Sequence, residues 1–222
     1  MTAAVIFDLD GTLVDSAADI AAAVNRMLAG IGEPPMPVAE VQSYVGNGAP
    51  ALVARVLAAR RIAPARHAAL TAALLADYAA NPGDAGSLYS GALAALDALA
   101  AQGLRLGLCT NKPIGPTRLL LGRAGLGGCF HAVIGGDSLP QRKPDPAPLL
   151  TVWRALGTAA AIYVGDSGVD DATARAAGLP FVFHSGGYLN APRESIDPIA
   201  EFADFGQLPA IVSRLLSFGR ND

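Results

Sequence analysis

The sequence predicts an α/β fold, a Rossmann-like parallel sheet with helices on both faces, which carries an inserted all-helical cap domain. Two observations predict it. From residue 91 onward, helical segments alternate with short apolar runs, which is the pattern of consecutive βαβ units. Between a first apolar run and that alternation, residues 17–80 contain helical patterns only. We therefore expect a core domain of residues 1–15 and 86–222 and a cap domain of residues 16–85.

The expected elements follow in chain order. Residues 5–7 form a short apolar run with β-branched members, as a buried central strand requires. Glycine and proline clusters separate the helices of the insert, which ends at the turn residues 81–84 with a possible hinge at Gly86. Within the insert we expect helices at residues 17–29, 38–44, 50–61 and 64–80. Beyond it we expect helices at residues 92–101, 116–124, 147–156, 171–177 and 208–216, and strands at residues 104–108, 132–134, 161–164 and 180–183.

The composition is that of a compact globular protein. Of 222 residues, 52% are hydrophobic and 16% are charged, which excludes a disordered chain. The net charge is −3 and no basic run is present, which argues against nucleic acid as a partner. No apolar stretch approaches the ~18 residues of a membrane span, and the start lacks the pattern of a signal peptide. We therefore expect a cytoplasmic protein without a membrane partner.

Asp8 and Asp10 follow the first predicted strand directly. Ligands of open α/β sheets bind at the edge where such strands end. Two acids separated by one residue repel each other unless a cation or a shared proton holds them together, so the pair predicts a metal ion or separated pKa values. The alternative is a plain turn, because Asp-Gly is a common turn dipeptide.

Three further polar groups lie at or near predicted strand ends. Thr110 follows the strand at residues 104–108, Asp166 follows the strand at residues 161–164, and Lys143 precedes a helix in a Lys-Pro-Asp-Pro segment. A right-handed doubly wound topology places successive strand ends on one rim, so these groups can meet Asp8.

The set predicts phosphoryl transfer. Asp8, Asp166 and a backbone oxygen near Asp10 suit Mg²⁺, which also takes phosphate oxygens. Thr110 offers a hydroxyl and Lys143 a positive charge to the phosphate. Asp8 can then attack phosphorus to give an aspartyl-phosphate, while Asp10 protonates the leaving alcohol and later deprotonates water. Gly11, Thr12 and Asn111 adjoin these groups and are expected to contact substrate.

Each of these residues also has a structural interpretation. Thr110, Asp170 or Asp171 can merely cap a helix, and Lys143 can be a surface residue. The expected role of Asp171 is that of a helix-start residue. Lys112 has no defined role, and we expect it to be exposed. His184 and Tyr188 are expected to serve in packing or loop structure.

The motifs resemble those of the haloacid dehalogenase superfamily of phosphotransferases. The four segments that carry the resemblance are Asp8-Leu9-Asp10-Gly11-Thr12, Thr110, Lys143, and Gly165-Asp166-Ser167 with Asp170. The inserted helices look like the four-helix type of cap in that superfamily. Dehalogenase members lack an acid at the position of Asp10, so the resemblance implies phosphate ester chemistry.

More narrowly, the chain is similar to bacterial phosphoglycolate phosphatases in residues 45–49, 109–113 and 140–146. This resemblance implies Mg²⁺-dependent hydrolysis of 2-phosphoglycolate, a small phosphorylated acid, to glycolate and phosphate. By this resemblance, Asp8 is the nucleophile and a metal ligand, and Asp10 is the acid/base and a ligand through its carbonyl. Asp166 is the remaining protein ligand, and Asp170 supports these residues from behind. We expect Asn47 and Gly48 to lie on a cap loop that faces the core and contacts substrate, with a simple interhelical turn as the alternative.

Other functions use the same groups. A phosphatase of another small phosphate, such as a sugar phosphate, a nucleotide or pyrophosphate, and a phosphosugar mutase can share this core. A signalling receiver also accepts phosphate on Asp, but it needs neither an acid like Asp10 nor a large cap. The sequence leaves the physiological substrate and the oligomeric state open.

Overall fold

The computed structural model describes residues 2–81 and 87–218. Its centre is a six-stranded sheet in which every neighbouring pair is parallel, in the order β5-β4-β1-β6-β7-β8. This is the predicted parallel sheet. The strands are β1 (Ala3–Phe7), β4 (Arg105–Cys109), β5 (Ala132–Ile134), β6 (Ala160–Gly165), β7 (Phe181–His184) and β8 (Ala200–Phe202).

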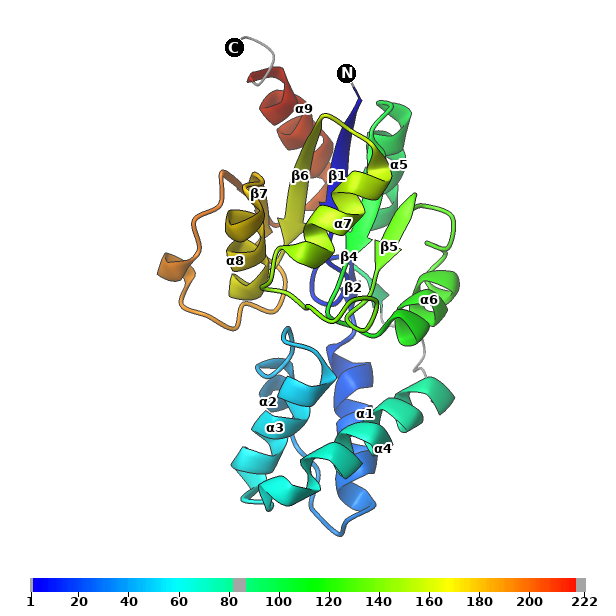
Figure 1. Cartoon of the computed structure of the whole chain (residues 1–222), viewed down its shortest axis with the longest axis vertical. Coiled ribbons are helices and arrows are strands. Elements are labelled where there is room, and N and C mark those ends of the chain that lie inside the picture. Colours follow the sequence, from blue (N-terminus) through cyan, green and yellow to red (C-terminus); the bar gives the residue numbers. More distant parts are fainter. Residues whose placement is uncertain (1, 82–86, 219–222) are drawn as a thin grey trace.

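β1 lies in the middle of the sheet because both of its faces are apolar. Val5 and Phe7 belong to one buried cluster, whereas Ala4 and Ile6 belong to another on the opposite face. Helices cover both faces, as the sequence predicts (Figure 1). One face packs against α5 (Ala92–Ala101), α6 (Ile114–Arg123) and α9 (Leu208–Phe218), and the other against α7 (Ala147–Leu156) and α8 (Gly168–Ala177).

The segment at residues 17–80 is helical throughout, as predicted, and has a buried cluster of its own. It packs beyond the carboxyl ends of the central strands (Figure 1). α1 contacts α2 and α4, and α3 packs on α4. The elements are α1 (Ala17–Ala29), α2 (Val38–Gln42), α3 (Ala49–Arg60), a 3-10 turn η1 (Pro64–Arg66) and α4 (His67–Ala80).

Three short strands are not predicted by the sequence. β2 (Val14–Asp15) pairs antiparallel with β3 (Ser87–Leu88) where the chain leaves and re-enters the core, and β8 lies at the sheet edge. Their sequences contain no apolar run like that of residues 132–134, so pairing with distant segments defines these strands. The expected turn at residues 81–84, the hinge at Gly86 and the domain boundary at residue 85 fall wholly or partly outside the described residues.

Two helices begin earlier than predicted. α6 starts directly after Pro113 rather than at residue 116, and α8 starts after Ser167 rather than at residue 171. Ser167 is the N-cap of α8, and it forms a capping box with Asp170. With this capping box, α8 begins close to the end of β6 and next to Asp166.

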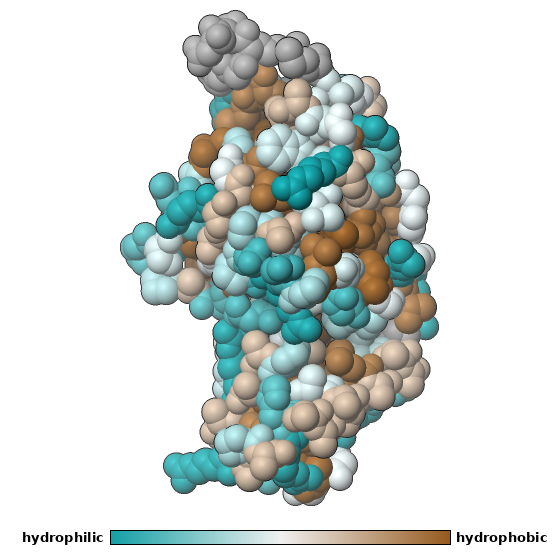
Figure 2. Space-filling view, in the orientation of Figure 1, coloured by the Kyte–Doolittle hydropathy of each residue, from teal (hydrophilic) through white to brown (hydrophobic). Residues whose placement is uncertain are grey.

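Polar and apolar residues are mixed over the face of the molecule drawn in Figure 2. Hydrophilic residues gather where the helical segment meets the sheet domain. Across residues 2–81 and 87–218, none of the helices combines the length and the apolar character needed to cross a membrane.

Candidate active site

Asp8 and Lys143 form a buried ion pair at the carboxyl end of the sheet. Asp8 is the first residue after β1, and its main-chain N–H donates to the carbonyl of Val164 on β6 (2.9 Å). Lys143 lies on the segment between β5 and α7, and its Nζ is 2.9 Å from Oδ1 of Asp8. The two side chains are 9% and 2% exposed, respectively. A carboxylate is therefore held next to a positive charge in a site that excludes most water.

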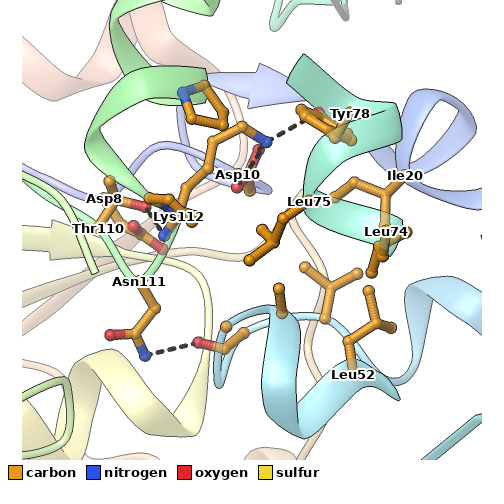
Figure 3. A pocket seen from close by; sticks show the side chains of 16 residues that line it. Asp8, Asp10, Ile20, Leu52, Leu74, Leu75, Tyr78, Thr110, Asn111 and Lys112 are labelled. Atoms are coloured by element: carbon orange, nitrogen blue, oxygen red, sulfur yellow. Dashed lines mark hydrogen bonds and ion pairs between the residues drawn. The ribbon is translucent and has the colours of Figure 1, made fainter. Parts of the chain in front are cut away.

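The other predicted strand-end residues lie at the same edge. Thr110 directly follows β4 and Asp166 directly follows β6. Carboxylate oxygens of Asp8, Asp166 and Asp170 lie within 4.8 Å of one another. Thr110 and Asp8 line one cavity, where their side chains are neighbours (Figure 3). The topology thus brings together four strand-end groups that are far apart in sequence.

Lys143 does not neutralise the three carboxylates. Burial raises the pKa of Asp8 to about 7; Lys143 opposes this shift and Asp170 adds to it. Burial also raises the pKa of Asp166 well above its ordinary value, and the charges of Asp170 and Asp8 raise it further. The acidic cluster therefore favours the binding of an additional cation.

The donor atoms of this cluster fit a hard divalent cation. Oδ1 of Asp8 is buried, and its contact with Lys143 Nζ at 2.9 Å leaves further lone pairs of the carboxylate available. From the described residues, Oδ1 of Asp166 accepts a hydrogen bond from the Thr12 hydroxyl (2.7 Å), and its Oδ2 accepts one from the main-chain N–H of Tyr188 (2.7 Å). Oxygen ligands with free lone pairs are the ligands that ions such as Mg²⁺ require. Asp8 and Asp166 are thus the residues that could hold a metal.

Asp170 is already occupied by protein partners. Its Oδ1 accepts from Lys143 Nζ (2.7 Å) and from the Tyr163 hydroxyl (2.8 Å), and its Oδ2 accepts from the Ser167 hydroxyl (2.5 Å). It is fully buried. Asp170 therefore orients the ammonium of Lys143 towards Asp8. Sequence analysis missed Tyr163, because it lies in an apolar strand and gives no signal of a polar role.

Asn111 binds the backbone of Lys143 and also contacts the helical segment. Its side-chain oxygen accepts from the Lys143 N–H (3.1 Å), and its amide donates to the Lys143 carbonyl (3.1 Å). The same amide donates to the carbonyl of Gly46, on the loop before α3 (2.9 Å). Asn111 lines the cavity and fixes the position of Lys143 as well.

Gly11 and Thr12 lie against Asp166 and do not line the cavity that contains Asp8. The fully buried hydroxyl of Thr12 holds Asp166, as described above. Gly11 has a φ of +86°, and a Cβ there would lie 2.3 Å from Asp166 Oδ2. Only glycine fits both this backbone conformation and this approach.

Lys112 is buried, so the expectation of an exposed side chain is wrong. Its Nζ lies 3.0 Å from Asp10 Oδ1 and donates to the hydroxyl of Tyr78 on α4 (2.8 Å) (Figure 3). Burial alone would lower the pKa of Lys112, but Asp10 and Tyr78 raise it above its ordinary value. Asp10 Oδ1 also accepts from the Ser16 hydroxyl (2.6 Å). The missed partner, Tyr78, lies about thirty positions away in sequence, on a different element.

A small cavity separates these polar groups from the helices. It encloses about 80 Å³. The core side provides polar and charged groups, and α1, α3 and α4 provide an apolar wall (Figure 3). The polar groups are those of Asp8, Asp10, Thr110, Asn111 and Lys112, and the apolar wall includes Ile20, Leu52, Leu74 and Leu75.

The loop before α3 faces the core. Gly48 lines the cavity with a φ of +82°, and a Cβ there would lie 3.1 Å from the Asn111 carbonyl. Asn47 points elsewhere: its side-chain oxygen accepts from Arg55 (2.6 Å), and both residues line a second cleft. The structure places Gly48, and not Asn47, in the lining of the cavity that contains Asp8.

His184 and Tyr188 have the packing and loop roles expected from the sequence. His184 is buried and stacks on Phe202, with ring centroids 5.0 Å apart. Tyr188 packs into the buried cluster of the helical segment. Its hydroxyl donates to Asp15 (2.5 Å) and accepts from the N–H of Ala17 (2.8 Å), where the chain enters α1.

Comparison with known proteins identifies the family. Residues 2–178 match the model of the haloacid dehalogenase-like hydrolases. The chain belongs to this family. A phosphoglycolate phosphatase of Cereibacter sphaeroides is 51% identical over 96% of this chain and 99% of its own length, and one of Rhodospirillum rubrum is 50% identical over 94% and 90%. A crystal structure titled as a predicted phosphoglycolate phosphatase from Haemophilus somnus 129pt has a TM-score of 0.86 at 30% identity, covering 94% of this chain and 97% of its own.

Proposed function

We propose that this haloacid dehalogenase-like hydrolase is a phosphatase that converts 2-phosphoglycolate to glycolate and phosphate through an aspartyl-phosphate. The observation that carries the proposal is the buried Asp8–Lys143 pair, whose Asp8 lines a small cavity together with Asp10. The substrate follows from the relatives named phosphoglycolate phosphatase, which are about half identical over nearly the whole chain.

In the first step an oxygen of Asp8 forms a bond to phosphorus, and the bond from phosphorus to the glycolate oxygen breaks. Asp10 gives a proton to that oxygen as it leaves. Lys143, held by Asp170, places positive charge beside Asp8 where negative charge develops on the phosphoryl oxygens. The Thr110 hydroxyl accepts from the Lys112 N–H (3.2 Å), and it would donate its own hydrogen to a phosphate oxygen.

In the second step a water molecule attacks phosphorus, and Asp10 takes its proton. The bond between phosphorus and Asp8 breaks, which regenerates the Asp8 carboxylate and releases phosphate. Asp10 is suited to both steps because it lines the cavity and is only partly buried. A phospho-accepting receiver does not need such a group.

The metal expected for this chemistry is Mg²⁺. The carboxylates of Asp8 and Asp166 and the backbone carbonyl of Asp10 would hold it, and Asp170 would support them from behind. When bound, the ion supplies charge that draws the phosphate and the nucleophile together. Gly11 and Thr12 would act through Asp166, because both contact that carboxylate.

We also propose that residues 16–85 form a cap domain over a core of residues 1–15 and 86–222. The separate buried cluster of α1–α4 supports this division, as does the antiparallel pair of β2 and β3 at the crossing point. In this arrangement the apolar wall of the cavity belongs to the cap, and it limits the access of bulk water to the site.

The test is the initial rate of phosphate release, with Mg²⁺ and with EDTA, from 2-phosphoglycolate and from a panel of sugar phosphates, nucleotides and pyrophosphate. We expect metal-dependent release and a preference for 2-phosphoglycolate of ~100-fold or more in kcat/KM. Equal or faster release from another compound would overturn the substrate but not the phosphatase. Turnover that survives Asp8→Asn would overturn the proposed nucleophile.

A further inference from the structure

Lys112 is the sole cation among the described residues that line the cavity. The other lysine, Lys143, makes ion pairs with Asp8 and Asp170 and does not line it. Lys112 lies at the end of the cavity formed by α4, where Tyr78 accepts a hydrogen bond from its Nζ. The two ammonium groups therefore face different parts of the site.

The proposed substrate carries two anionic groups, and each needs a partner. The phosphate would be bound by Lys143 and by the cation that the acidic cluster holds. The carboxylate is only a few bonds from phosphorus, so it must lie in the same small cavity. The wall formed by Ile20, Leu52 and Leu74 offers it no hydrogen-bond donor. A carboxylate buried against such a wall without a cation would be strongly disfavoured.

We propose that Lys112 binds the carboxylate of the phosphorylated acid and thereby selects acids over neutral phosphate esters. This inference rests on the proposed function. In the structure, Nζ of Lys112 already binds one carboxylate, that of Asp10, at 3.0 Å. A substrate carboxylate would make the same charge-assisted hydrogen bond from the cavity side.

Tyr78 has a positioning role in this arrangement. Its hydroxyl accepts from Lys112 Nζ at 2.8 Å, and the ammonium lies 4.4 Å from the centre of its ring. Both contacts hold a long, flexible side chain in one orientation. Because Tyr78 belongs to α4, the helical segment orients a charge that is carried by the core.

The experiment compares two esters with similar leaving groups, 2-phosphoglycolate and 2-hydroxyethyl phosphate, which has an alcohol in place of the carboxylate. The readout is the ratio of their kcat/KM values in wild type, Lys112→Met and Ser16→Ala, all with Mg²⁺. Met keeps the length of the side chain and removes its charge. Ser16→Ala is the matched control, because it also removes a hydrogen bond to Asp10 but leaves the cation in place.

We expect Lys112→Met to lower the ratio by about 30-fold or more, with the loss confined mainly to 2-phosphoglycolate. Ser16→Ala should slow both esters together and leave the ratio unchanged. An equal loss for both esters in Lys112→Met would overturn the inference, because it would show that Lys112 acts only through Asp10. If Lys112→Met does not fold, Tyr78→Phe should lower the ratio severalfold, and an unchanged ratio would overturn the inference.

The wild-type protein separates this inference from the proposed function. Failure to hydrolyse 2-phosphoglycolate, with turnover of other esters, would overturn the proposed function. Hydrolysis of 2-phosphoglycolate no faster than of 2-hydroxyethyl phosphate would leave the phosphatase in place and overturn the role of Lys112.

Discussion

The ammonium of Lys143 lies 2.9 Å from Oδ1 of Asp8, and both side chains are almost completely buried. Removing one partner of such a pair leaves an uncompensated charge in a low-dielectric site. Lys143 also pairs with Asp170 at 2.7 Å, so its loss exposes two carboxylates to each other. The position of this one side chain therefore affects both the stability and the chemistry of the site.

Lys143→Met should lower kcat by at least about 100-fold, and should reduce the free energy of unfolding by about 3 kcal/mol. Urea unfolding and steady-state kinetics in Mg²⁺ measure the two effects. Arg175→Gln is the control, because Arg175 pairs with Asp171 but is 64% exposed. That variant should change stability by less than about 1 kcal/mol. Equal effects of the two substitutions would contradict the special role of the buried pair.

The metal-free protein should lose stability as pH rises. Burial raises the pKa of Asp8 to about 7, whereas the unfolded chain has the ordinary value of about 3.9. Between these values the folded state holds a proton that the unfolded state has lost, so stability falls with rising pH, by about 3 kcal/mol between pH 5 and pH 8. The raised pKa of Asp166 acts in the same direction. Urea unfolding in EDTA at a series of pH values measures this slope.

Asp8→Asn serves as the comparison for that slope. Without an ionisable group at this position, the decline between pH 5 and pH 8 should be smaller. An identical slope in the two proteins would show that Asp8 does not titrate in this range.

The effect of Asp10→Asn should depend on the leaving group. Glycolate is a poor leaving group and needs a proton, whereas para-nitrophenolate leaves without one. We expect Asp10→Asn to slow formation of the aspartyl-phosphate by about 100-fold or more with 2-phosphoglycolate, and much less with para-nitrophenyl phosphate. Burst-phase kinetics isolate this step. Equal losses with both substrates would argue against Asp10 as the acid.

Gly48→Ala should impair catalysis more than a matched glycine substitution. Both Gly48 and Gly32 have positive φ angles, of +82° and +76°, so both substitutions strain the backbone. A Cβ at Gly48 would lie 3.1 Å from the Asn111 carbonyl, whereas a Cβ at Gly32 meets nothing within 4 Å. We expect the two substitutions to reduce stability by similar amounts. We expect only Gly48→Ala to lower kcat/KM. Equal kcat/KM values in the two variants would contradict a role of this loop at the site.

Tyr188→Phe should destabilise the junction between the sheet domain and α1. The substitution removes the hydroxyl that donates to Asp15 and accepts from the Ala17 N–H. The buried Ala17 N–H then loses the hydroxyl but keeps its longer contact to Asp15 Oδ1 (3.3 Å), so the free energy of unfolding should fall by about 1 kcal/mol. Thermal unfolding measures this loss, and Tyr44→Phe, whose hydroxyl donates a long hydrogen bond to Glu40 (3.3 Å), is the control.

Much of this fold could be predicted because its signals are local. The apolar run of β1, the caps and breaks of the helices, and the polar residues after β4 and β6 are all present in short windows of sequence. Helices α5 and α7 and strand β5 match their predicted bounds. The strands β2, β3 and β8 could not be found in this way, since each is defined by pairing with a distant segment.

The site shows the same division. The residue types at Asp8, Thr110, Lys143 and Asp166, together with a parallel topology, were enough to predict that these groups meet at one edge of the sheet. Lys112 was predicted to be exposed, because its burial depends on Asp10 and on Tyr78 of α4, which no local pattern connects to it. The hydrogen-bond partners of the Tyr163 and Tyr188 hydroxyls likewise could not be predicted from local sequence, because they depend on the tertiary structure.

By itself, the sequence determined the α/β class, the helical insert and the chemical groups at the strand ends, because backbone propensity and residue chemistry are local properties. Only the tertiary structure decided which carboxylates remain free for a cation, that Asn111 binds the backbone of Lys143, and that Lys112 faces the cavity. Those features depend on distances between side chains from different elements, and packing of the whole chain sets those distances.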